Sequence, residues 1–400
     1  MTSNYAPKTF LRRVDKSLLR QYLQNLHVGE DIDWDALKPR EIDSIFEAIE
    51  GAPEDIRGQI EREFQTVHNL ATAGGRKTFK ELVWADEDIS SQLDEMKDHL
   101  DVALWMFMEH KDLFEEASLF YQADNLSNWR KVKNLPETDP VTGGQSCALL
   151  EAALSEHFVI TEARGHKCKV DYYRRGDMNY WFAYPQDYSG LYAGFDDKDQ
   201  FDFLPQKPAF EIVLVHDPNE RSLIVYIKGQ KKVAAAVQRI WAEKILNEEI
   251  DITDDVEKVY EIQGLLDRGF AFPTDPEDGI WEVRVKKLRL DLDSGQKRGE
   301  KRRIIVEADS GRSDKAIYDL LDDVLAGERI PKDRLKVTQA GIRITWKPEG
   351  GKRGKTLTFD VSPPNSCSLK CEPRHDLAKK YLKIWGLDVS GNSEKDTAKS

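Results

Sequence analysis

The chain has 400 residues, of which 40% are hydrophobic and 33% are charged, and its formal net charge is −13. This much apolar material is typical of a folded protein of two or three domains and excludes a fully disordered chain. The sequence has no run of 18 apolar residues, no secretory signal pattern and only four cysteines, so we expect a cytoplasmic protein without a membrane span or a disulfide scaffold.

Charge is distributed unevenly along the chain. Residues 1–150 contain 17 Lys and Arg against 28 Asp and Glu, and residues 151–280 contain 15 against 25. Residues 281–400 contain 27 Lys and Arg against 19 Asp and Glu, so the C-terminal third is basic in an otherwise acidic protein. Such a change of sign predicts separate surfaces with different partners, and the basic surface suits phosphate groups.

Residues 1–135 have the hydrophobic spacing of helices, and we predict an acidic, all-helical domain there. Its longest periodic stretch runs from Ile89 to Tyr121, with an apolar stripe through Leu100, Leu104 and Phe107. The clearest breaks are Gly74-Gly75 and the Pro/Gly-rich residues 134–144.

Residues 145–268 change to a mixed pattern, which predicts an α+β domain. A helix over 145–157 precedes strand-like runs, and further helices follow near 233–241 and 253–267. The last two runs flank Asp217-Pro218-Asn219 and predict a buried β-hairpin. The predicted strands are 167–173, 178–184, 209–215 and 222–228.

Residues 281–388 predict a second α+β domain with an antiparallel sheet, followed by a disordered tail over 389–400. The predicted fold class is therefore multidomain, with an all-helical N-terminal domain and two mixed α+β domains. The predicted elements are strands 282–290, 303–308, 335–338, 341–347 and 355–361, and helices 313–326 and 375–386.

The basic domain contains two hairpins whose turns both include Lys-Arg-Gly. Glycine lets a tight turn form and lets a phosphate approach the backbone. We interpret the turns as cationic tips that grip a nucleic-acid backbone, although Lys-rich turns also protect sheet edges from aggregation. The predicted nucleic-acid-binding residues are Arg284, Lys286, Arg289, Lys297, Arg298, Lys301, Arg302, Arg303, Lys352, Arg353 and Lys355.

Strand alternation assigns one face of these hairpins to solvent. Ile342 and Ile344 point to the opposite face from Arg343 and Thr345. Lys287 interrupts the alternation of the first hairpin, which predicts a β-bulge.

No sequence pattern identifies a catalytic centre. Glu211, Asp217 and Lys228 only faintly resemble the acid–acid–lysine layout of metal-dependent nucleases, because Tyr226 stands where the second carboxylate belongs. Cys367, Cys371 and His375 lack the second tight ligand pair of a structural zinc site. We therefore predict neither a metal nor a cofactor, and a non-enzymatic protein is favoured over a hydrolase.

Residues 171–205 combine eleven aromatic residues with seven aspartates. Half-exposed tyrosines are typical of recognition surfaces, and Tyr184, Tyr188 and Tyr192 are the predicted contacts for a partner protein. The alternative is a packed sheet face followed by a long solvated loop.

These patterns together favour a non-catalytic binding component. Its basic C-terminal domain would contact nucleic-acid phosphates, DNA or RNA, and its acidic helical domain would dock a partner protein or cover the basic surface. Two alternatives stay open: a degenerate metal-dependent nuclease in the central domain, and a protein–protein adaptor that uses the aromatic–acidic segment.

Overall fold

The fold was analysed in a computed structural model. The structure describes residues 5–38, 40–196, 200–229, 231–250, 259–292, 302–308, 315–328, 330–348, 354–369 and 373–389. The chain divides into two compact units, Met1–Asn125 and Leu126–Ser400.

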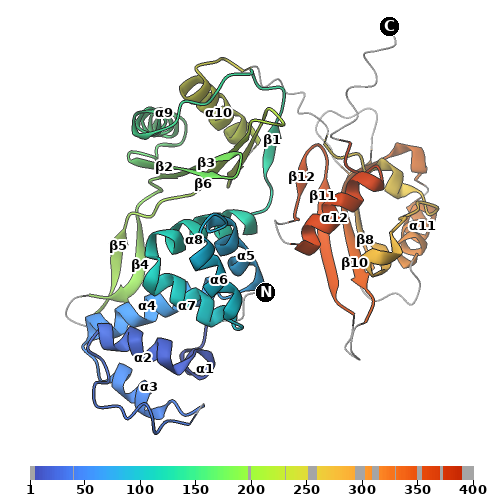
Figure 1. Cartoon of the computed structure of the whole chain (residues 1–400). Coiled ribbons are helices and arrows are strands. Elements are labelled where there is room, and N and C mark those ends of the chain that lie inside the picture. The colour runs from blue at the N-terminus through green and yellow to red at the C-terminus, as the bar shows by residue number, and fades with distance from the viewer. Residues whose placement is uncertain are drawn as a thin grey trace. The chain divides into compact units, whose positions relative to one another are not determined.

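The first unit is all-helical, as predicted (Figure 1). Its buried side chains form one core that includes Leu19, Phe64, Phe79 and Leu104, each at most 2% exposed. Its helices are α1 (Pro7–Arg13), α2 (Lys16–Asn25), α3 (Asp43–Glu50), α4 (Glu54–Leu70), α5 (Ala73–Leu82), α6 (Glu87–Glu95), α7 (His99–Glu109) and α8 (Lys111–Asn125).

The stretch from Ile89 to Tyr121 is not one helix. It spans α6, α7 and α8, and local capping explains the first break. The Asp98 carboxylate accepts a hydrogen bond from the Leu100 backbone N–H at 2.8 Å, which starts α7 after Met96 has become extended. The apolar stripe continues across the breaks because all three helices bury residues in the same core.

The second unit begins ten residues before the predicted domain boundary. A short strand, β1, extends the central sheet by pairing Arg130 with Val225 and Val132 with Leu223, so residues 126–135 belong to the second unit rather than to the helical one. The elements of this part are β1 (Arg130–Val132), α9 (Gly144–Glu162), β2 (Cys168–Arg175), β3 (Met178–Pro185), β4 (Gly190–Phe195), β5 (Phe201–Gln206), β6 (Ile212–Asp217), β7 (Ser222–Ile227) and α10 (Lys231–Trp241), which continues as a π-helical turn over Ala242–Leu246.

The central sheet is antiparallel in the order β1-β7-β6-β3-β2. Helices α9 and α10 pack together with it in one core, in which Phe158, Trp181 and Trp241 are fully buried (Figure 1). The predicted hairpin of β6 and β7 is confirmed, with Ile212 paired to Ile227 and Asp217 to Ser222. Strands β4 and β5 form a separate two-stranded sheet where the sequence suggested a loop.

A second core in this unit holds the C-terminal elements, whose sheet has the order β12-β11-β10-β8-β9. Helices α11 and α12 contribute Leu321 and Tyr381 to that core, so they cover one face of the sheet. The elements are the short turns Gln263–Leu266, Pro276–Asp278 and Lys332–Arg334, strands β8 (Ile280–Leu292), β9 (Arg302–Glu307), β10 (Leu335–Trp346), β11 (Thr356–Ser362) and β12 (Ser366–Cys367), and helices α11 (Ala316–Glu328) and α12 (Pro373–Ile384).

Two of the predicted elements differ from the structure. The predicted helix over 253–267 is wrong at Tyr260, which forms a β-bridge with Asp388, and residues 251–258 lie outside the described part. The predicted strands 335–338 and 341–347 are the single strand β10. The predicted tail lies outside the described residues from 390 onward.

Candidate functional site

The face of the C-terminal sheet opposite α11 and α12 carries the charged side chains of β8, β9 and β10. The predicted alternation is confirmed, because Ile342 and Ile344 are fully buried while Arg343 lies opposite Thr358 of β11. The predicted bulge is also confirmed, since the register shifts between the pairs Gly341–Lys287 and Ile342–Val285. We call this surface the outer sheet face; its described cations are Arg284, Lys287, Arg289, Arg303, Lys336 and Arg343, and its described acids are Glu282, Asp291, Glu307 and Asp360.

Three of these cations already have acidic neighbours. Arg284 lies 2.5 Å from Glu282, Arg303 lies 2.8 Å from Asp291, and Lys287 lies 4.0 Å from Asp360. All six side chains are between 28% and 41% exposed. Ion pairs this exposed contribute about 0–1 kcal/mol each, so a phosphate can compete with the carboxylates for the same cations.

Two arginines occupy positions that favour an anion. Arg284 and Arg343 stand directly opposite each other on β8 and β10, which brings their Cβ atoms to about 5 Å and is unfavourable for like charges. Arg289 lies between Gln339 and Ile305 in the middle of the sheet. Its Nε is buried without a hydrogen-bond partner among the described residues, which costs free energy until an acceptor arrives.

Not every predicted nucleic-acid contact lies on the outer sheet face. Lys286 is the residue in the bulge and is only 8% exposed, so the structure removes it from the accessible surface. Arg302 and Lys355 are exposed at strand ends. Lys297, Arg298, Lys301, Lys352 and Arg353 lie outside the described residues.

The strand ends that carry the two Lys-Arg-Gly segments lie at opposite ends of the sheet. The first segment follows Leu292, which pairs with Leu335 at the start of β10, and the second follows the end of β10 at Trp346, which pairs with Ile280. At about 3.3 Å per residue, these ends are about 40 Å apart. The strand ends from which the two segments leave are therefore separated by the length of the outer sheet face, and the lysine and arginine of each segment lie outside the described residues.

The three residues of the nuclease-like pattern do not form one site. Glu211 precedes β6 and Lys228 follows β7 at the end where Ile212 pairs with Ile227, whereas Asp217 ends β6. The six residues from Glu211 to Asp217 span about 20 Å of strand, too far for a shared metal ion. Asp217 also accepts hydrogen bonds from the backbone N–H groups of Asn219 and Glu220, at 2.9 and 3.1 Å, and thereby stabilises its own turn.

The three predicted partner-binding tyrosines lie in different surroundings. Burial raises the pKa of Tyr184, which belongs to β3, to about 12, with Glu211 adding to the effect. The Tyr188 hydroxyl donates to the Glu162 carbonyl oxygen at 2.6 Å, and Arg164 lies 5.5 Å from its ring centre. Only Tyr192 belongs to the β4–β5 hairpin. The structure therefore does not gather these residues into one surface.

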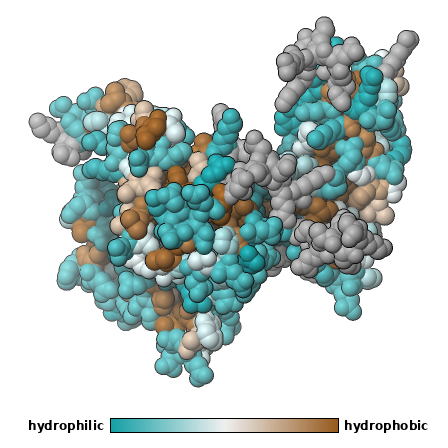
Figure 2. Space-filling model, turned by 90° about the horizontal axis from the view of Figure 1, so that it is seen from above, coloured by the Kyte–Doolittle hydropathy of each residue, from teal (hydrophilic) through white to brown (hydrophobic). Residues whose placement is uncertain are grey.

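The sequence reasoning missed the β4–β5 hairpin, which brings several exposed apolar residues together. Its Leu191, Phe195, Phe201 and Phe203 are between 56% and 68% exposed. By contrast, the molecular face shown in Figure 2 is mostly hydrophilic with scattered hydrophobic areas. The alternation of apolar and polar residues in Phe201-Asp202-Phe203 was the available signal, and Gly190, Gly194 and Pro205 obscured it.

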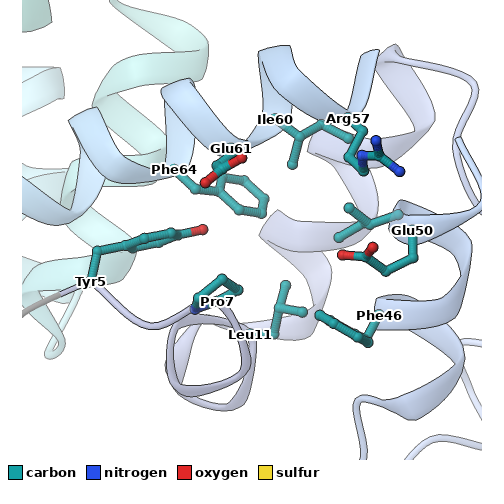
Figure 3. Close-up of a pocket in the computed structure, with 10 residues that line it drawn as sticks. Tyr5, Pro7, Leu11, Phe46, Glu50, Arg57, Ile60, Glu61 and Phe64 are labelled. Atoms are coloured by element: carbon teal, nitrogen blue, oxygen red, sulfur yellow. The ribbon is translucent and has the colours of Figure 1, made fainter. Parts of the chain in front are cut away.

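A small pocket lies in the helical unit between α1, α3 and α4. The Tyr5 hydroxyl points into it beside Glu61, and Glu50 and Arg57 lie together at its other end (Figure 3). Burial, followed by the charge of Glu61, raises the pKa of Tyr5 to about 12. The pocket volume of about 260 Å³ is below the range of about 300–1,000 Å³ that small-molecule sites occupy.

The described residues offer no candidate for a metal site or for a membrane-spanning helix. Across the described ranges, no three His, Cys, Asp or Glu side chains are grouped so that they could hold a metal ion. No helix in the described part of the chain is both long and apolar enough to cross a membrane. No protein-family model matches the sequence, and a search of curated proteins found no relative.

Proposed function

We propose that the protein is a non-catalytic binding component whose C-terminal domain contacts the phosphate backbone of a nucleic acid across the outer sheet face. The observation that carries the proposal is Arg289, which lies in the middle of a face with six described cations and whose Nε is buried with no hydrogen-bond partner among the described residues. A phosphate oxygen is an acceptor that would suit this Nε, and arginine binds phosphate with two parallel hydrogen bonds.

The arrangement of the cations supports a polymer rather than a single anion. Arg284, Lys287 and Arg289 occupy successive outer positions along β8, where residues on one face repeat at about 7 Å. The other described cations, Arg303 on β9 and Lys336 and Arg343 on β10, lie on the strands at either side. The strand ends from which the two Lys-Arg-Gly segments leave are about 40 Å apart, which corresponds to about 12 base pairs. The face carries no aromatic stacking platform among its cations, so the contacts favour backbone over base recognition.

The acidic helical unit completes the proposal. It docks a partner protein or covers the basic face when no nucleic acid is bound, as its excess of acids over bases suggests. If the acidic unit covers the basic face, it competes with nucleic acid for that face. Salt weakens this competition, because it screens the attraction between the acidic unit and the basic face.

Fluorescence anisotropy tests the proposal with labelled duplex and single strands of about 16 nucleotides at low salt. We expect Arg289→Gln combined with Arg343→Gln to weaken binding at least about tenfold. The matched control is Lys379→Gln with Lys383→Gln, which removes two charges from α12, the helix that packs on the covered face. Absence of binding by the wild type, or equal loss in the two double variants, refutes the proposal.

A further inference from the structure

The β4–β5 hairpin has one face made only of apolar side chains. Directly opposed residues of an antiparallel pair point to the same side, so the register fixes which residues share this face. The opposed pairs are Leu191–Pro205, Ala193–Phe203 and Phe195–Phe201. The other face carries Tyr192 opposite Leu204 and Gly194 opposite Asp202.

The apolar face is open to solvent. Leu191 and Phe195 are each 68% exposed, Phe201 is 62% exposed and Phe203 is 56% exposed. The rings form a chain of edge-to-face contacts, with 5.8 Å between the centres of Phe195 and Phe201 and 5.9 Å between those of Phe201 and Phe203. A two-stranded hairpin is at best marginally stable alone, and covering this face would stabilise it.

The size of the exposed surface matches an interface. Taking roughly 200 Å² for each large side chain, these exposures leave about 500 Å² of the four residues in water. Two such faces in contact would bury about 1,000 Å², which is the lower limit for a specific protein interface.

The charge around the face selects the kind of occupant. In the described residues of the hairpin, 190–196 and 200–206, the charged groups are Asp196 and Asp202, with no lysine or arginine. These acids would repel nucleic-acid phosphates and anionic lipids. The apolar face itself is uncharged, so a second copy of the same face can contact it without repulsion between like charges.

We propose that two copies of the chain pair through the apolar faces of their β4–β5 hairpins. The contact is symmetric, with each face serving as the partner of the other, and the two hairpins stack about 10 Å apart as in a small β-sandwich. The pairing goes beyond the proposed nucleic-acid contact and responds to salt in the opposite direction. Salt screens the mutual repulsion of two chains that each carry a net charge of −13, so it strengthens the dimer while it weakens phosphate binding.

Sedimentation velocity of the full chain at low and high salt tests the pairing. Protein concentrations between about 1 and 100 µM cover the dissociation constants expected of an interface this small. We expect a concentration-dependent dimer that tightens with salt. Phe203→Ser should weaken it at least about 30-fold, because each substitution appears twice in a symmetric interface. Phe203→Leu should keep most of the affinity. Tyr192→Ser, on the opposite face of the same hairpin, is the matched control and should leave the dimer intact.

Four outcomes overturn the proposal. The first is a wild type that stays monomeric at 100 µM, a concentration on the order of the dissociation constants of the weakest specific interfaces. The second is a dimer that Phe203→Ser leaves unchanged. The third is equal loss in Phe203→Ser and Tyr192→Ser, which would trace the dimer to hairpin folding rather than to the apolar face. A monomeric wild type that floats with neutral phosphatidylcholine vesicles, and loses this with Phe203→Ser, assigns the face to lipid and also overturns it.

Discussion

Replacing Arg164 by methionine should destabilise the central α+β region by about 2–3 kcal/mol. Its guanidinium donates to Glu162 Oε2 from Nε at 2.8 Å and to Asp187 Oδ1 from Nη1 at 2.9 Å, and lies 3.9 Å from the ring centre of Phe210. Arg164 is 15% exposed, and the two acids are 24% and 32% exposed. Breaking a fully buried ion pair costs about 3–5 kcal/mol, and partial solvation of the stranded acids reduces that cost.

The pH dependence of this loss gives a second check. Burial is the largest single influence on Asp187 and opposes its ionisation, but the hydrogen bond from Arg164, the hydrogen bond from the Tyr188 backbone N–H and the charge of Arg164 together leave the pKa of Asp187 lowered. A carboxyl whose folded pKa lies below its unfolded value of about 3.9 stabilises the fold above that value and loses this contribution as pH falls. The difference between the wild type and Arg164→Met should therefore shrink in acid.

Urea denaturation followed by hydrogen exchange of peptides from α9 and β3 measures this region separately from the others. Arg174→Met is the matched control, because Arg174 is 66% exposed and lies 4.0 Å from Asp177, a pair worth at most about 0.5 kcal/mol. A loss below about 1 kcal/mol for Arg164→Met, or equal losses for the two variants, refutes the assigned role of Arg164.

Two further predictions concern a buried histidine and a buried glycine. Burial lowers the pKa of His216 despite the nearby charge of Asp217, so the folded protein favours the neutral imidazole. The urea midpoint of the central region should therefore fall as pH drops below about 6.5, and His216→Gln should remove this pH dependence. The same pH dependence of the midpoint in that variant contradicts the prediction. Gly75→Ala should destabilise the helical unit by about 2 kcal/mol or more, because its Cβ would lie 2.1 Å from the Leu70 carbonyl oxygen. Gly144→Ala, with open space around its Cβ, should be neutral or stabilising in the same thermal unfolding assay.

Local sequence patterns were sufficient for the elements that alternate or repeat regularly. The faces of β10 and β11 follow from the alternation around Arg343, and the bulge follows from its interruption at Lys287. The helices of the first unit follow from hydrophobic spacing, but their ends depend on caps such as Asp98, which the periodicity hides. The three-residue strand β1 has no local signal, because only its pairing with β7 makes it a strand.

The candidate site was harder to predict because it depends on register. The turn after Asp217 fixes the pairing of β6 with β7 and thereby separates Asp217 from Lys228, although the two lie only eleven residues apart in the chain. The pairing of β8 with β10 likewise places Leu292 and Trp346, the strand ends that lead into the two Lys-Arg-Gly segments, at opposite ends of one sheet, which two similar hairpins in sequence did not reveal. The pairing of β8 with β9 also places Asp291 opposite Arg303, whereas Glu282 and Arg284 are neighbours on the same face of β8.

The salt dependence of nucleic-acid affinity tests the central claim most directly. A duplex of about 16 base pairs is long enough to reach from one end of the outer sheet face to the other. Each phosphate that the protein contacts releases counterions, so the slope of log K against log salt changes by about 0.9 for each contact. We expect a steep slope of log K against log salt for the wild type. The slope should be shallower by about 2 or more when Lys297, Arg298, Lys352 and Arg353 are all changed to glutamate. The same slope and affinity in both proteins, or no binding by the wild type at low salt, would contradict it.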